Sequence, residues 1–361
     1  MRLVLACPPE LKMLEQFGRM KVRSVLVSYW YLQHVSQERG EALLRSLKDQ
    51  GCWILIDSGA FSIFGSASWW EMRLTGKPKV RTDKYALEAM EERKAEGLHC
   101  DAERAFGEID DYVKKYIKWA QHMKAQGLYD VVAEVDVDPI VGMKQVDSWR
   151  DEWEAAGLLE ELLVTLHPRG HWNLAGGGGG GSEAPFSMKN AMQVSDVDHM
   201  YSGRFNFVGC SSGSDESTYR MIYSKWGTPM RKNRVRMHGW AMTNYHQMET
   251  QPWYSVDSSS WAGFGRWGIL YKWNEERQFI DQIIVPETIQ KREQKNAWRI
   301  KQFREHHWDE VEELGLAEGI ATLDNRAVEL WNASQWAKWQ LAYEGKTRDA
   351  YWLTDEERRG M

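Results

Sequence analysis

Short apolar runs rich in β-branched residues recur along the chain, and amphipathic stretches separate them. A continuous apolar run of about four to eight residues between turn residues is typical of a strand that is buried on both faces. Nine runs have this character: residues 3–6, 24–29, 53–56, 130–135, 162–166, 205–209, 234–237, 253–256 and 267–273.

Helical periodicity marks several of the segments between these runs. Over residues 108–127 apolar side chains recur three and four positions apart, and Gly127 stands where a C-terminal cap belongs. This pattern predicts an amphipathic surface helix. Residues 41–51 and 215–227 repeat the order of helix and then glycine before a following strand.

The alternation of strands and helices predicts a parallel sheet, and the number of units favours a closed (β/α)8 barrel of the TIM type over an open doubly wound sheet. No glycine-rich nucleotide-binding loop follows an early strand, which disfavours a Rossmann fold. Nine strand candidates leave one to spare. We expect residues 1–285 to form the barrel and residues 286–361 to form a C-terminal helical segment that packs on it.

One low-complexity segment interrupts the barrel region. Residues 175–185, AGGGGGGSEAP, have the composition of a flexible linker. A natural loop insertion and an engineered loop replacement both remain open.

Composition narrows the class of protein. Of the 361 residues, 43% are hydrophobic and 27% charged, as in globular proteins, and no apolar run reaches the roughly 20 residues of a membrane span. The first residues lack the apolar core of a signal peptide. The four cysteines are scattered, so we expect a reducing compartment and no cysteine-based zinc site. We also expect no cofactor. The sequence predicts a cytoplasmic protein.

Charge and aromatic residues leave two interpretations open. The net charge of −6 argues against indiscriminate nucleic-acid binding, yet basic islands occur at residues 77–81, 231–238 and 291–307. A solvated face is the simpler interpretation of any one island. The 20 tryptophans suit base stacking or the edges of a core.

Polar residues follow the predicted strands. Active sites of this barrel gather at the carboxyl ends of its strands, so these residues are candidates for a site, although each one alone could be a helix N-cap. Three aspartates in equivalent places make capping a weaker explanation. The candidates are Asp57, Asp136, Asp138, His167, Arg169, Cys210, Ser211, Ser212, His238 and Asp257.

Motifs around these aspartates resemble the tRNA-guanine transglycosylase family. LIDSGAFS (55–62) looks like its Asp-Ser-Gly-Gly-Phe signature, and YSVDSSSW (254–261) resembles the strand that carries its nucleophilic aspartate. AEVDVDP (133–139), FVGCSSGSD (207–215) and RMHGWAMT (236–243) follow the family's order. The similarity spans roughly residues 50 to 270. It is closest to the phage and bacterial branch that inserts 7-deazaguanine bases into DNA.

The resemblance implies a pentosyltransferase that exchanges guanine in DNA for a 7-deazaguanine derivative. Asp257 would attack C1′ of the nucleoside, Asp57 would manage protons on the bases, and Asp136 would recognise the purine. The implied substrate-binding residues are Asp136, Ser58, Gly59, Phe61, His167, Gly209, Cys210, Ser211, His238 and Gly239. The candidate contacts to nucleic acid are Arg231, Lys232, Arg234 and Arg236.

The chain also departs from the family. No cysteine follows Cys210, so the family's zinc site, with its three cysteines and a histidine, is absent or replaced, and we expect no metal. HPRG (167–170) stands where the family offers a glutamine to the base. Alternatives that remain are a transglycosylase acting on tRNA, a catalytically silent nucleic-acid-binding barrel, and a generic barrel hydrolase. A homodimer is also left open.

Overall fold

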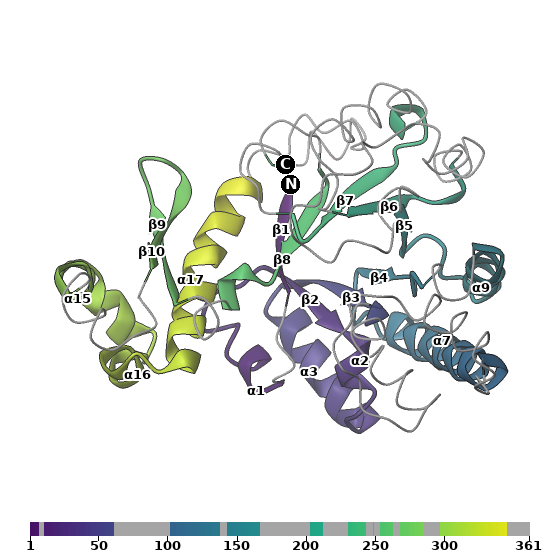
Figure 1. The fold of residues 1–361 in the computed structure, drawn as a ribbon, viewed down its shortest axis with the longest axis horizontal. Helices are drawn as coiled ribbons and strands as arrows, with labels where there is room; N and C mark the ends of the chain where they lie inside the picture. Colours follow the sequence, from purple (N-terminus) through teal and green to yellow (C-terminus); the bar gives the residue numbers. More distant parts are fainter. Residues whose placement is uncertain are drawn as a thin grey trace, which may run out of the picture. The chain divides into compact units, whose positions relative to one another are not determined.

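A computed structural model describes residues 1–6, 11–60, 102–137, 143–166, 203–211, 230–242, 248, 253–262, 268–284 and 297–344. Eight parallel strands close into a barrel in sequence order (Figure 1), which confirms the predicted (β/α)8 fold. The strands are β1 (Arg2–Ala6), β2 (Ser24–Ser28), β3 (Trp53–Asp57), β4 (Val131–Ala133), β5 (Leu162–Leu166), β6 (Phe207–Ser211), β7 (Arg236–Trp240) and β8 (Ser255–Ser258).

Helices stand where the amphipathic patterns predict them. The pattern over 108–127 lies largely within α7, and Gly127 follows that helix with a positive φ of 66°. The pattern over 41–51 lies in α3, and residues 215–227 lie outside the described residues. The helices are α1 (Leu11–Leu14), α2 (Tyr29–Leu32), α3 (Gln37–Asp49), α7 (Ala102–Ala125), α9 (Met143–Ala155), α15 (Ala297–Glu313), α16 (Ala317–Thr322) and α17 (Asn325–Glu344), with a 3₁₀ turn η2 (Ser260–Ala262).

The ninth apolar run, over residues 267–273, does not belong to the barrel. It forms β9 (Ile269–Asn274), which pairs antiparallel with β10 (Phe279–Ile284) in a separate two-stranded sheet (Figure 1). From Tyr271 to Asn274 buried and half-buried residues alternate, as in a strand with one covered face. The spare strand candidate is therefore one half of a hairpin.

The chain divides into two compact units. The first comprises Met1–Val27, Val35–Leu55 and Gly239–Met361, and the second comprises Ser28–His34 and Ile56–His238.

Helix α17 is the centre of the C-terminal part of the first unit. Its side-chain amides replace a neighbouring strand along β9, because Asn332 Oδ1 accepts from the Tyr271 amide at 2.8 Å and Gln335 Oε1 accepts from the Trp273 amide at 3.0 Å. Gln340 Nε2 donates to the Leu3 carbonyl on β1 at 2.7 Å. The C-terminal helix thus contacts both the hairpin and a barrel strand.

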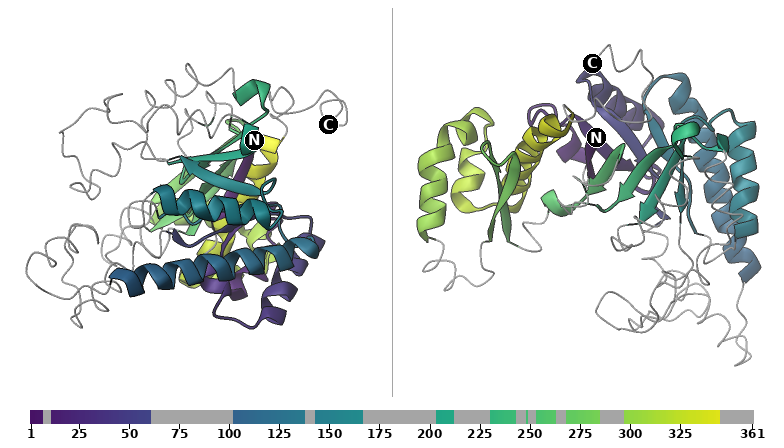
Figure 2. Two further views of the ribbon diagram at one scale, coloured as in Figure 1. Left: turned by 90° about the vertical axis from the view of Figure 1, so that its right-hand side faces the viewer. Right: turned by 90° about the horizontal axis from the view of Figure 1, so that it is seen from above.

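In the second unit, helices α7 and α9 run side by side (Figure 2). Trp149 Nε1 of α9 donates to Asp110 Oδ1 of α7 at 2.8 Å. Tyr116 of α7 stacks on Tyr29 with ring centroids 4.6 Å apart and meets the edge of Trp153 at 5.3 Å. These aromatic contacts join α7 to α2 and to α9.

Candidate functional site

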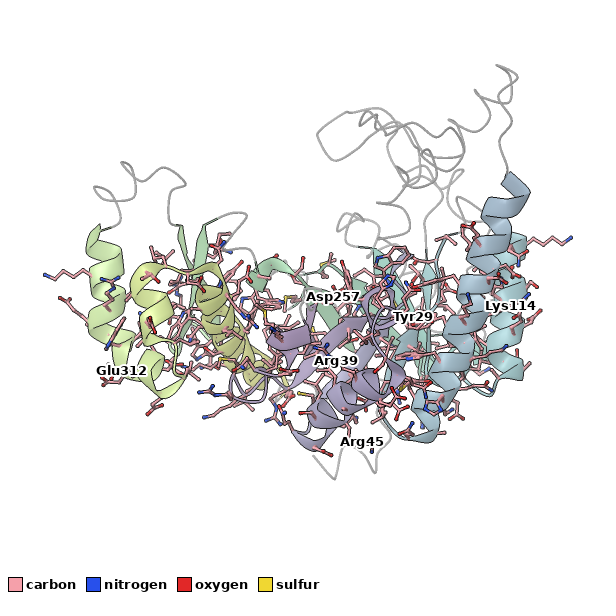
Figure 3. The ribbon with its side chains drawn as sticks, turned by 90° about the horizontal axis from the view of Figure 1, so that it is seen from below. Tyr29, Arg39, Arg45, Lys114, Asp257 and Glu312 are labelled. Carbon is pink, nitrogen blue, oxygen red and sulfur yellow. The ribbon has the colours of Figure 1, made fainter. Side chains whose placement is uncertain are left out.

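Asp257 lies among buried side chains near the end of β8 (Figure 3) and is itself only 6% exposed. Its Oδ1 accepts a hydrogen bond at 2.8 Å from the amide of Ala241, just beyond the end of β7. Ala241 has a φ of 51°, an uncommon conformation for a residue other than glycine. A buried carboxylate held by a main-chain donor keeps one orientation, as an aligned nucleophile requires.

Gly239 allows this arrangement by having no side chain. A Cβ at this position would stand 2.8 Å from Met242 Cβ and 3.2 Å from Val256 Cγ1. The turn that carries Ala241 can therefore approach β8 only with glycine here. This is a packing role, and it accounts for Gly239 without a contact to substrate.

The serines after Asp257 serve the backbone. Ser258 Oγ accepts from the Ser260 amide at 3.0 Å and lies 2.9 Å from Ser260 Oγ. The buried Ser258 thus satisfies the start of η2, as a capping residue does. Capping of η2 therefore accounts for Ser258. It does not account for Asp257, whose carboxylate bonds to the turn after β7.

Asp57 ends β3 in a tight turn. Its Oδ2 accepts from the Gly59 amide at 3.0 Å, and Ser58 Oγ accepts from the Ala60 amide at 3.3 Å. Gly59 has a φ of +80°, and a Cβ there would lie 2.5 Å from Trp30 Cβ. The Asp-Ser-Gly order therefore has a local structural reason, and Asp57 is half-buried at the end of its strand.

Two tyrosines of α7 support this turn. Tyr112 donates to the Ser58 carbonyl at 2.6 Å, and Tyr116 donates to the Ile56 carbonyl at 3.3 Å. Burial raises the pKa of Tyr112 strongly, and the Asp57 carboxylate raises it further. Both causes keep the Tyr112 phenol protonated, so it remains a donor to Ser58. Together with Tyr116, which donates to Ile56, it holds the chain on either side of Asp57.

Asp136 follows β4 in a sharp turn. The Val137 amide donates to the Val135 carbonyl at 3.1 Å, which turns the chain at Asp136. Both valines are buried while Asp136 is half-buried. The turn therefore sets the carboxylate apart from its apolar neighbours.

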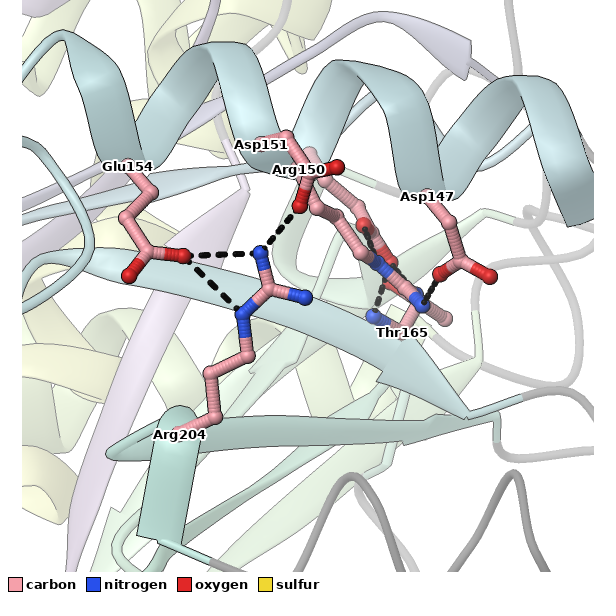
Figure 4. Close-up of polar contacts among 7 residues, drawn as sticks. Asp147, Arg150, Asp151, Glu154, Thr165 and Arg204 are labelled. Atoms are coloured by element: carbon pink, nitrogen blue, oxygen red, sulfur yellow. Dashed lines mark hydrogen bonds and ion pairs between the residues drawn. The ribbon is translucent and has the colours of Figure 1, made fainter.

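Just before this turn lies a buried ion pair that the sequence analysis missed. Arg150 of α9 donates to Glu134 through Nε at 2.7 Å and Nη2 at 2.8 Å (Figure 4), and both side chains are 3% exposed. Arg150 Nη1 also donates to Asp147 at 2.9 Å. Burial alone would lower the pKa of Arg150, but the Glu134 and Asp147 carboxylates together outweigh it and the pKa is raised. A helical Arg 16 residues after a strand-end Glu is too common a spacing to predict such a pair.

Strands β6 and β7 hold the other predicted pocket residues. Gly209 pairs with Thr165 of β5, and Cys210, which is buried, pairs with Leu166. Ser211 ends β6. His238 of β7 is fully buried, with its ring 6.4 Å from that of Phe207, and its contact with a substrate stays a prediction.

The predicted nucleic-acid contacts lie at the other ends of the strands. Arg231, Lys232 and Arg234 are exposed and precede β7, whose first residue is the half-buried Arg236. Asp57 and Asp136, in the same unit, stand at carboxyl ends. A five-residue strand is roughly 16 Å long, so these cations do not line the rim with the aspartates. Their contact with nucleic acid stays a prediction.

Several predicted residues lie outside the described part of the chain. They are Phe61, Asp138, His167, Arg169, Ser212, the glycine-rich segment 175–185 and the basic island 77–81. Of the island at 291–307, the described residues are those of α15 from Ala297 onward.

Comparison with known proteins adds no identification: no protein-family model matches the chain, and no curated protein matches its sequence. Across the described ranges, no helix is long and apolar enough to cross a membrane. In the same ranges no three His, Cys, Asp or Glu side chains are grouped to hold a metal ion. The family resemblance stays a prediction. The structure itself supplies the barrel fold and the carboxylates near the ends of its strands.

Proposed function

We propose that this chain is a base-exchange transglycosylase that replaces guanine in DNA with a 7-deazaguanine derivative. The observation that carries the proposal is Asp257, a buried carboxylate at the end of β8 with one oxygen held by the Ala241 amide. Asp57 and Asp136 stand at carboxyl ends of strands in the same closed barrel, the end at which this fold carries its active sites. The ordered family motifs around these residues support the assignment.

The chemistry is a double displacement at C1′ of the nucleoside. In the first step a carboxylate oxygen of Asp257 bonds to C1′ as the bond from C1′ to N9 of guanine breaks. The bonding electrons leave with the base, which takes a proton from the Asp57 carboxyl group. In the second step N9 of the 7-deazaguanine bonds to C1′, Asp257 leaves as a carboxylate, and the N9 proton passes to Asp57.

Asp136 accepts hydrogen bonds from the donor edge of the purine in this scheme. A base that lacks those donors would leave the carboxylate unpaired in a desolvated site, and such a mismatch gives strong discrimination. The turn over Val135 and Val137 supports the role, because it holds the Asp136 backbone between two buried anchors.

DNA is favoured as the substrate by the form of the motifs and by the lack of cysteines after Cys210. In a duplex the target nucleotide has to be flipped out of the stack or already unpaired. A transglycosylase acting on tRNA is the second candidate, because the same carboxylates would serve it.

Isotope-labelled guanine or 7-deazaguanine is supplied with either DNA or unmodified tRNA, and the nucleosides are then analysed by mass spectrometry. The wild type should label DNA, and Asp257→Asn should abolish labelling. Asp309→Asn, which changes an exposed aspartate of α15, is the matched control and should retain it. A folded Asp257→Asn protein that still exchanges bases would refute the nucleophile assignment. Labelling of neither nucleic acid by the wild type would favour a silent barrel.

A further inference from the structure

The hydroxyl group of Thr165 is buried, and within the described ranges no group pairs with it. Thr165 is 4% exposed, and its Oγ1 has no partner among the described residues. Buried hydroxyls are nearly always paired, so an unpaired one in a folded protein needs a physical reason. One such reason is a ligand that pairs with it.

Thr165 lies where the ladder between β4 and β5 ends. The Glu134 amide donates to the Leu163 carbonyl at 3.0 Å, and the next bond of a parallel ladder would run from the Thr165 amide to the Glu134 carbonyl. Instead this amide donates to the Glu134 carboxylate at 2.6 Å (Figure 4). The side chain replaces the main chain, so β4 leaves the ladder at the residue before the turn at Asp136.

The strand register sets the direction of the Thr165 side chain. Glu134 points outward, because it pairs with Arg150 on the covering helix α9. Side chains alternate along a strand, and paired residues of a sheet face the same side. Ala133 therefore points into the barrel, as does its partner Leu163, and Thr165 follows two residues later on the same side.

The same register describes what surrounds the hydroxyl inside the barrel. Leu163 pairs with Phe207, and both are buried, so they form an apolar layer one step below Thr165. Gly209, the partner of Thr165, has no side chain to fill the space at this level. The inward hydroxyl of Thr165 thus stands directly above the apolar pair of Leu163 and Phe207 and beside a glycine.

We propose that Thr165 Oγ1 is a base-binding group on the floor of the substrate pocket, where it pairs with a polar edge of the purine or 7-deazapurine. This inference rests on the proposed function and assigns a specificity residue to it. A threonine hydroxyl can donate to a ring nitrogen or carbonyl oxygen and can accept from an N–H group. The same register directs Cys210 outward and Gly209 inward, so of these two predicted pocket residues it is Gly209 that faces this base.

Two substitutions at this position separate a ligand contact from a role in folding. Thr165→Val keeps the shape and removes the hydroxyl, and Thr165→Ser keeps the hydroxyl. Thr322→Val, at an exposed residue of α16, is the matched control. An assay of base exchange measures kcat and the KM for the free base. Calorimetry measures the Kd for guanine and for 7-deazaguanine, and thermal unfolding measures Tm.

Thr165→Val should raise KM and Kd for the base about three- to tenfold, the usual cost of one lost hydrogen bond. Its kcat should stay within about twofold and its Tm should not fall, while Thr165→Ser and Thr322→Val should bind like the wild type. Unchanged Kd in Thr165→Val would overturn the inference, with or without a fall in Tm. If the wild type binds neither base, the proposed function fails as well. If the wild type binds a base and Thr165→Val binds it with the same Kd, only this inference fails.

Discussion

The Glu134–Arg150 pair gives a quantitative test of what holds the end of β4. Arg150→Met keeps most of the volume of the side chain but leaves the Glu134 carboxylate, 3% exposed, without its cation. Removing one partner of a buried ion pair typically costs about 3–5 kcal/mol, because the remaining charge is desolvated and uncompensated. We expect a loss of this size in the free energy of unfolding at neutral pH.

The same reasoning predicts a dependence on pH. Glu134 still accepts from the Thr165 amide in this variant, but a buried carboxylate without a compensating cation favours its neutral form. In Arg150→Met the folded state therefore binds a proton more readily than the unfolded state does. Stability of the variant relative to the wild type should therefore improve as pH falls and worsen as it rises. Glu134→Gln with Arg150→Met removes the buried charge altogether and should recover part of the loss.

The measurement is urea unfolding followed by circular dichroism at pH 7 and at pH 5, with the wild type beside each variant. Arg204→Met is the matched control, because Arg204 also reaches α9, where it pairs with the exposed Asp151 at 2.5 Å and Glu154 at 2.8 Å (Figure 4). Surface pairs contribute about 0–1 kcal/mol. The reasoning is refuted if Arg150→Met costs no more than Arg204→Met, or if its deficit is the same at both pH values.

Three further substitutions test separate parts of the structure. Gly59→Ala should lower Tm more than Gly51→Ala. Both glycines have a positive φ near 80°, but of the two only Gly59 would bring its added Cβ to 2.5 Å from Trp30 Cβ. Equal shifts in Tm would mean that this contact is not real. Tyr112→Phe removes the donor to the Ser58 carbonyl and should cost about 1 kcal/mol in chemical unfolding, and a neutral result would show that this bond does not stabilise the turn. Gln340→Leu leaves the Arg23 amide and the Leu3 carbonyl without this partner and should lower the free energy of unfolding by about 2–4 kcal/mol. Leu341→Gln, at an exposed position, should be nearly neutral. Similar effects of the two substitutions would contradict the role of α17.

The candidate site was only partly visible in the sequence. The strand-end positions of Asp57, Asp136 and Asp257 follow from apolar runs that end in a carboxylate, and the structure places all three there. The main-chain donor to Asp257 comes from a turn 16 residues earlier, and no spacing rule predicts that approach. Because carboxylates at strand ends also cap local turns, only the structure separates Asp257, bonded to another strand's turn, from Asp57, bonded to its own.

The sequence by itself determined the barrel, since buried β-branched runs alternating with amphipathic helices can satisfy their backbone and cover their apolar faces in few other ways. It could not decide that the run at 267–273 forms a hairpin, because an apolar run does not specify its partner. Nor could it predict the Glu134–Arg150 pair or the Thr165 hydroxyl, which has no partner in the part of the chain that the structure describes. Both arise from contacts between distant segments and from which side of a strand faces the lumen, and only tertiary packing sets that register.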